Sequence, residues 1–272
     1  MKKNYSLQDW EALFTRELKG GNPSSFHYSP LDSIELPPYI QPENQSSFSI
    51  PQHSSIKHSF HWNLSDELAQ QYTSLLSDYT LTHWFSSPAL KHKDLPSTKF
   101  ESLIEINPNL LKTRDDQKII TLHIDHINPS SFRIADYFKN EDRIQLWIRP
   151  SHDIYLNMGM IRGIQKALHK LGFTDRCQLY TEINASEMND LHQNMIAWTL
   201  QCTASLLAGL NQFIWHLAPV QKIKIENLSL ILNIPEILIR EANLTKAGDA
   251  IQGSDFLEEL SDQIATLIMK PQ

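Results

Sequence analysis

Short apolar segments alternate with longer amphipathic segments in the second half of the chain, and this alternation constrains the fold most. Residues 143–148, 178–183 and 212–217 are short, contain β-branched and aromatic residues, and are typical of strands. Apolar residues with helical spacing mark 153–171 and 189–207, which lie between them. Because successive strand, helix and strand units pair in parallel, we predict an α/β fold with crossover helices.

The first half of the chain and the tail continue this pattern less regularly. Further strands are predicted at residues 57–62, 81–85, 101–106 and 118–124, and further helices at 66–76, 228–242 and 256–269. Pro235 should kink or split the helix that contains it. The pattern predicts about six core strands, fewer than the eight of a closed β/α barrel.

The amino-terminal region, residues 1–55, has a different character. Ser6 and Asp9 have the spacing of a capping box, and they begin a predicted helix that ends at the glycine pair 20–21. Residues 22–51 then carry six of the chain's fourteen prolines, a density that forbids regular helix. The stretch is too rich in aromatic and aliphatic residues for a plain linker, so we interpret it as an arm that wraps over something.

Composition excludes several classes of protein. Lys and Arg number 24 against 31 Asp and Glu, a net charge of −7 that argues against a nucleic-acid-binding protein. Two cysteines, Cys177 and Cys202, are too few for a four-thiolate zinc site or a dense disulfide framework. Only eight glycines occur, with no dinucleotide or P-loop motif. No apolar run approaches the roughly 20 residues that span a bilayer, so we expect a cytoplasmic protein without membrane contacts.

Three blocks, taken in order, resemble the barrel subunits of the methylmalonyl-CoA mutase family. The first is a helix ending in E-L-K-G at residues 17–20, followed by an arm ending in P-P-Y at 37–39. The second is residues 159–163, which resemble the family's A-K-x-R-A helix and keep Arg162. The third runs from residue 190 to 268 and keeps the motif positions Asn194, Thr199, Asn233, Glu241, Asp249, Gly253 and Ser254.

This resemblance implies a TIM-type β/α barrel over residues 56–272, shortened and not necessarily closed, preceded by the arm at 1–55. An open barrel would expose strand edges, which the arm or a partner subunit would cover. The resemblance also implies that the arm embraces a partner.

Departures from the family pattern bear on activity. Met160 stands where the family helix has lysine, Trp198 lies where its arginine is expected, and Leu232 replaces another arginine. The G-Y-H motif of the catalytic barrels is absent. We also expect this chain to lack the cobalamin-binding domain that follows those barrels in the family. Residues 190–195 match the cobalt-binding pattern D-x-H-x-x-G only in part, because Met195 replaces the glycine, and we interpret His192 as part of an amphipathic helix.

The sequence therefore leaves three functional hypotheses. The first is a non-catalytic small subunit of a heterodimer, binding no cofactor alone, whose large mutase partner carries adenosylcobalamin and interconverts methylmalonyl-CoA and succinyl-CoA. The second is an independent enzyme, either a small acyl-CoA isomerase or a metal-dependent hydrolase. The third is a degenerate binding or regulatory module.

A ligand site, if one exists, belongs at the carboxyl ends of the parallel strands, where β/α folds place their active sites. The candidates for this strand-end rim are Trp147, Arg149, His152, Glu182 and His216, with Asn184 near the same edge. A metal pair formed by His123 and Asp125 next to His126 is less favoured than a solvated strand end, because no third ligand is evident. Gly159 and Gly163 share one helix face, which favours tight packing of that helix against the sheet over approach of a ligand.

Overall fold

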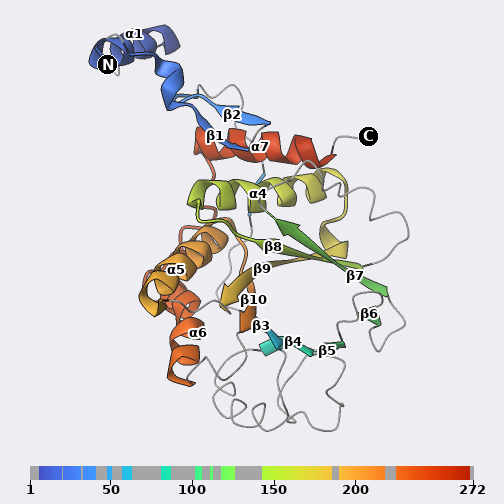
Figure 1. Ribbon diagram of the computed structural model, residues 1–272. Coiled ribbons are helices and arrows are strands. Elements are labelled where there is room, and N and C mark those ends of the chain that lie inside the picture. Colours follow the sequence, from blue (N-terminus) through green and yellow to red (C-terminus); the bar gives the residue numbers. More distant parts are fainter. Residues whose placement is uncertain are drawn as a thin grey trace.

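The structure is a computed structural model (Figure 1), and its description covers most of the second half of the chain and parts of the first. The described residues are 6–19, 21–31, 33–40, 48–50, 57–62, 81–86, 102–105, 111–112, 118–125, 143–185, 190–217 and 225–269. For the strands between residues 57 and 125, only the backbone is described. The predicted helix at 66–76 lies outside these ranges.

The element bounds agree closely with the predicted segments. The helices are α1 (Leu7–Glu17), α4 (Ile154–Lys170), α5 (Leu191–Leu207), α6 (Ile225–Arg240) and α7 (Asp255–Met269), with the 3-10 turns η1 (Pro23–Phe26) and η3 (Thr174–Arg176). The strands are β1 (Tyr28–Leu31), β2 (Ile34–Leu36), β3 (Lys57–Trp62), β4 (Leu81–Ser86), β5 (Ser102–Glu105), β6 (Leu111–Lys112), β7 (Lys118–Asp125), β8 (Arg143–Arg149), β9 (Cys177–Ala185) and β10 (Gln212–Leu217).

Eight strands form one sheet in the order β5-β4-β3-β10-β9-β8-β7-β6. All neighbours in it are parallel except β6 and β7, so the predicted parallel pairing is confirmed. The last strand, β10, pairs with both β9 and β3. The carboxyl ends of β8, β9 and β10 therefore meet at one edge of the sheet.

The predicted TIM-type barrel is wrong. Such a barrel closes eight parallel strands into a ring, whereas β5 and β6 are the two ends of this sheet and no ladder joins them within the described residues. Closure requires matching tilt and register at every strand, and β6 is only two residues long and antiparallel to its neighbour. The part with described side chains is a small α/β unit built on three parallel strands, β8, β9 and β10, with a separate two-stranded antiparallel sheet.

Layers of helix cover one face of these three strands (Figure 1). Helix α4 lies against the sheet, α7 lies on α4, and the β1–β2 hairpin lies on α7. The core between these layers contains Ile144, Leu146, Ile148, Ile161, Ile164, Leu179, Leu260 and Ile264. Thr181 of β9 donates to Ser205 of α5 at 2.8 Å, so the helices cover the face of β9 that Thr181 shares with Leu179.

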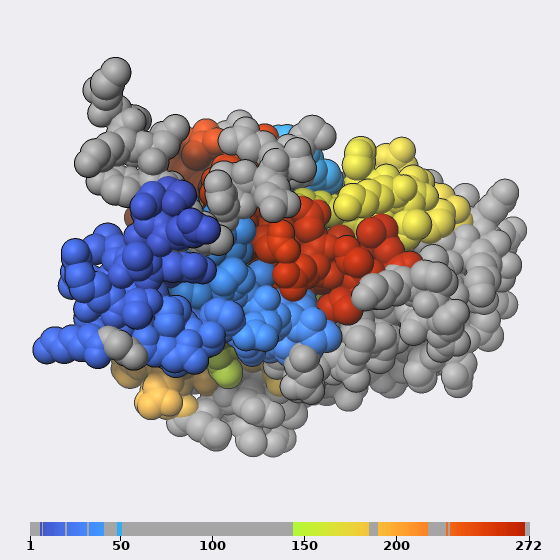
Figure 2. Space-filling model, turned by 90° about the horizontal axis from the view of Figure 1, so that it is seen from above, coloured from blue at the N-terminus to red at the C-terminus, as the bar shows by residue number. Residues whose placement is uncertain are grey.

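The amino-terminal arm wraps over the chain's own body. Its hairpin, which the proline density did not predict, buries Ile34 and Leu36 in the same core as α4 and α7. The hydroxyl of Tyr28 donates to the Asp153 carboxylate at 2.5 Å, which joins the hairpin to the start of α4. Seen from above in Figure 2, the arm (blue) runs alongside α7 (red).

Local signals in the sequence explain where the helices begin. Ser6 and Asp9 form the predicted capping box of α1, with Ser6 accepting from the amide of Asp9 and Asp9 accepting from that of Ser6. Asp153 caps α4 by accepting from the amides of Tyr155 and Leu156, and Asp190 caps α5 by accepting from the amides of His192 and Gln193. Pro235 does not split α6, which continues through it to Arg240.

The two glycines of α4 are packing positions, but against α7 and not the sheet. A Cβ on Gly159 would lie 2.6 Å from side-chain atoms of Leu260, and one on Gly163 would lie 2.9 Å from the Ser261 carbonyl oxygen. Only hydrogen at these positions lets the two helices approach so closely.

Candidate functional site

Three of the five rim residues converge at the carboxyl ends of neighbouring strands. Arg149 ends β8, and its Nη2 donates to Oε1 of Glu182 on β9 at 2.6 Å. Nε2 of His216, near the end of β10, lies 2.9 Å from the same oxygen. The side chain of Glu182 is only 1% exposed, against 47% for Arg149 and 21% for His216. A buried carboxylate is thus held by a guanidinium and an imidazole that both reach solvent.

Trp147 completes this cluster from the side. Its ring lies edge-on to His216, with the centroids 6.1 Å apart, and only 1% of the residue is exposed. Because alternate residues of a strand share a face, Trp147 and Arg149 lie on the face of β8 opposite to its helix-covered Leu146 and Ile148. That face also carries buried polar groups, since Gln145 donates to Gln178, which in turn accepts from the hydroxyl of Tyr180.

His152 follows the end of β8, and Asn184 lies near the end of β9. Both residues are exposed. His152 lies in the turn after β8, which Asn157 holds by accepting from Ser151 and donating back to its carbonyl oxygen. Gln201 of α5 also donates to the Pro150 carbonyl oxygen in this turn, at 3.4 Å. The rim as a ligand site remains a prediction, with Arg149, Glu182 and His216 at its centre.

Metal binding gains no geometric support from the described residues. Within them, no three His, Cys, Asp or Glu side chains gather as a metal site requires. The backbone of His123 pairs with Trp147 and that of Asp125 with Arg149, while His126 lies outside the described ranges. The amide of His192 donates to Asp190, so the partial D-x-H pattern begins helix α5. Within the same residues, no helix combines the length and apolarity needed to cross a bilayer.

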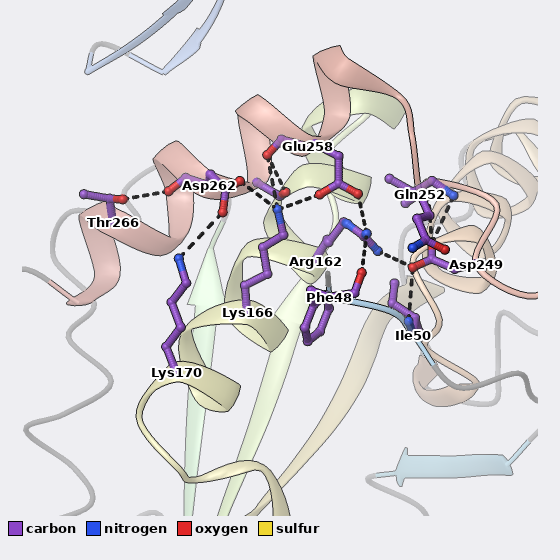
Figure 3. A network of polar contacts seen from close by, with 12 residues as sticks. Phe48, Ile50, Arg162, Lys166, Lys170, Asp249, Gln252, Glu258, Asp262 and Thr266 are labelled. Atoms are coloured by element: carbon purple, nitrogen blue, oxygen red, sulfur yellow. Dashed lines mark hydrogen bonds and ion pairs between the residues drawn. The ribbon is translucent and has the colours of Figure 1, made fainter. Parts of the chain in front are cut away.

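A second polar cluster, the α4–α7 network, lies on the other side of α4 (Figure 3). Arg162 is fully buried and donates to Asp249 at 2.8 Å, to Glu258 and to the Phe48 carbonyl oxygen at 3.3 Å. One turn later in α4, Nζ of Lys166 lies 2.7 Å from Oε2 of Glu258 and 3.0 Å from Oδ2 of Asp262. Two buried cations are therefore neutralised by carboxylates from α7 and from the turn before it.

The motif positions that carry the family resemblance divide between this network and helix surfaces. Asp249 accepts from Arg162, and Gly253 and Ser254 complete the turn that leads into α7, with Gly253 at a φ of +84°. Thr199 donates to the Met195 carbonyl oxygen within α5. Asn194 lies on α5, Asn233 lies on α6, and Glu241 directly follows the end of α6.

Sequence reasoning missed the residues that complete both clusters. Lys166 and Glu258 were not recognised as network partners, although Arg162 and Lys166 are spaced i, i+4 among the apolar residues of α4, which signals an acidic partner. Phe48 was missed because it contributes a carbonyl oxygen and a ring face, with the Arg162 guanidinium carbon 5.4 Å from the ring centroid. No sequence pattern marks such a contact.

Comparison with known proteins adds no relative. No family model matches the sequence, and no curated protein is significantly similar to it.

Proposed function

We propose that this chain is a non-catalytic accessory subunit that pairs with a large, adenosylcobalamin-dependent mutase subunit. That partner would carry the cofactor and interconvert methylmalonyl-CoA and succinyl-CoA, and the pair would be cytoplasmic. The proposal rests on the sequence resemblance and on the placement of the amino-terminal helix. The free state of both cysteines is consistent with a reducing compartment.

The observation that carries the proposal is the position of α1, which stands away from the body at the end of the arm (Figure 1). Its aromatic face packs on the arm itself, with Trp10 stacked on Phe14 and on Tyr39 at centroid distances of 4.6 and 5.2 Å. Leu13 and Phe26 remain about half exposed. A projecting helix with exposed apolar side chains suits contact with another protein more than an isolated monomer.

The state of Arg162 supports a non-catalytic role. An arginine that binds a substrate carboxylate or a CoA phosphate must present its guanidinium to that anion. Arg162 is fully buried and is bound to two carboxylates of its own chain. The motif position that the chain keeps thus holds the fold together.

Affinity capture from the native lysate, with mass spectrometry of the bound proteins, tests the proposal. The wild-type chain should recover a large mutase subunit that carries a cobalamin domain. Leu13→Glu, which places a charge on the exposed apolar position of α1, should lose that partner. Thr15→Glu is the matched control, because it adds the same charge at an exposed position on another side of α1.

Two results would contradict the accessory-subunit proposal. One is a wild-type chain that recovers no mutase subunit, and the other is recovery that is equal for both variants. A stable monomer without any mutase partner would favour the degenerate binding or regulatory module.

The convergence of Arg149, Glu182 and His216 favours a second candidate, an enzyme in its own right. A carboxylate that holds an imidazole at a strand end is an arrangement that general acid–base catalysis uses. Native mass spectrometry of the purified chain with added CoA esters tests it. A retained ester that is lost in Glu182→Gln but kept in Gln178→Glu, a change elsewhere on the same strand face, would support this candidate. No retained ester would exclude an acyl-CoA isomerase.

A further inference from the structure

The strand-end rim gathers a guanidinium and an imidazole around one buried oxygen atom. Nη2 of Arg149 lies 2.6 Å from Oε1 of Glu182, and Nε2 of His216 lies 2.9 Å from the same atom. Because both nitrogens contact one oxygen, the two side chains are close enough to bind a single small ligand. They are 47% and 21% exposed, so a ligand reaches both from solvent.

Aromatic side chains fill the same face of the sheet next to the rim. Trp147 on β8 shares the face of Arg149, and Tyr180 on β9 shares that of Glu182, because residues two apart in a strand point to one face. Trp147 and Tyr180 are 1% and 0% exposed. A ligand at the rim is therefore confined to the strand ends, and the group that Arg149 and His216 bind is small.

The charge of the cluster favours a carboxylate with a single negative charge. The planar guanidinium of Arg149 matches the two oxygens of a carboxylate. Glu182 already neutralises one positive charge, so a dianion such as phosphate would meet too little positive charge here.

The contact with Glu182 also fixes the hydrogen-bonding state of His216. Paired with Arg149, the Glu182 carboxylate is ionised and accepts hydrogen bonds only. It would repel a lone pair 2.9 Å away, so the proton of the neutral imidazole belongs on Nε2. Nδ1 then carries the lone pair, which suits a ligand that donates a hydroxyl group to it.

We propose that the strand-end rim binds a small hydroxy acid, whose carboxylate pairs with Arg149 and whose hydroxyl donates to Nδ1 of His216. Glu182 is a positioning residue, because it acts through the two residues that contact the ligand. This inference goes beyond the accessory role and needs no partner subunit. It uses the same residues as the second candidate function, but it does not rest on binding of a CoA ester.

Two acids that differ by one hydroxyl test this site. Lactate and propionate have the same charge and carbon skeleton, and NMR titration of the full chain with isotope-labelled histidines measures the affinity of each. Lactate should bind about tenfold more tightly than propionate, the effect of one added hydrogen bond. Equal affinities, or no saturable binding of lactate, would overturn the proposal.

Substitutions assign the two contacts. His216→Phe, which keeps a ring beside Trp147, should weaken lactate to the affinity of propionate, and His192→Phe, at an exposed position of α5, is its control. Arg149→Met should weaken both acids by about tenfold or more. Its control is Arg176→Met, because Arg176 directly precedes β9 and lies at the opposite end of that strand from the rim. Rim variants that bind as their controls do would refute the assigned contacts.

The labelled histidines also report the positioning role of Glu182. In the free chain, the nitrogen chemical shifts of neutral His216 should show the proton on Nε2, and Glu182→Gln should weaken this preference and reduce the advantage of lactate over propionate. A neutral ring with its proton on Nδ1 would contradict the proposal. Capture of a mutase subunit enters none of these measurements, so a failure here leaves the accessory-subunit proposal standing, and a failed capture leaves the ligand site standing.

Discussion

At the scale of single residues, α4 carries two buried cations that serve the fold. Arg162 and Lys166 are 0% and 2% exposed, and carboxylates of the chain neutralise both. Burying a charge is costly unless it is paired and hydrogen-bonded. The network therefore fixes the register of α4 against α7 more than it adds net stability.

Removing one partner of this network should be far more harmful than removing an exposed lysine of the same helix. Arg162→Met leaves the buried carboxylate of Asp249 without its cation, and should cost about 3–5 kcal/mol of unfolding free energy. The side chain of Lys170 is 53% exposed, and its Nζ lies 3.7 Å from Oδ1 of Asp262. Lys170→Met should therefore change the free energy of unfolding by less than about 1 kcal/mol. Urea denaturation of both variants measures the difference, and equal losses would contradict the buried network.

The two cysteines should be unreactive while the chain is folded. Burial raises the pKa of both the Cys177 and the Cys202 thiols, and the thiolate is the reactive form. A thiol-specific disulfide reagent at about pH 8 should modify neither quickly until urea is added. Because the folded pKa values are raised, these thiols should also lower stability as the pH rises above about 8.5, where the unfolded chain ionises. Fast reaction of two thiols in the native protein would show this burial to be wrong.

At the scale of elements, the sequence predicted most helices and strands of the described chain. Apolar spacing located α4 and α5 to within two residues at each end, because this signal is local. The β1–β2 hairpin was missed since Pro30 lies inside β1, where proline normally argues against a strand. Its stability comes from burying Ile34 and Leu36 on α7, a contact distant in sequence.

Helices α4 and α7 approach closely, and the two glycines of α4 should differ in how much an alanine substitution destabilises the protein. A Cβ on Gly163 would meet the backbone carbonyl oxygen of Ser261, which cannot turn aside, whereas one on Gly159 would meet the flexible end of Leu260. Gly163→Ala should therefore destabilise the protein by about 1–3 kcal/mol.

Gly159→Ala should lower the free energy of unfolding by less than Gly163→Ala does. Alanine also has a helix propensity that is more favourable than that of glycine by roughly 1 kcal/mol. Thermal unfolding of the two variants checks the ranking. A larger loss for Gly159→Ala would contradict the packing described between these helices.

At the scale of the whole molecule, strand direction was predictable and sheet closure was not. Alternating strands and helices imply parallel neighbours, but the ends of a sheet depend on pairing between strands that are distant in sequence. The short, antiparallel β6 overturned the barrel expectation, and its two residues gave no signal. The strand-end rim was likewise predictable only in part. Placing Arg149, Glu182 and His216 at strand ends predicted their convergence, whereas their shared contact needed the order β10-β9-β8.

The arm is buried in the core at the β1–β2 hairpin, through Ile34 and Leu36, whereas α1 at its amino-terminal end keeps Leu13 exposed. Hydrogen–deuterium exchange of residues 7–17, in the free chain and in the complex captured with the mutase subunit, tests this account most directly. We predict that the amides of α1 become strongly protected in the complex, while those of the core strand β9 change little. Unchanged exchange in α1, with protection appearing around Arg149 and His216 instead, would contradict the account and direct attention to the rim.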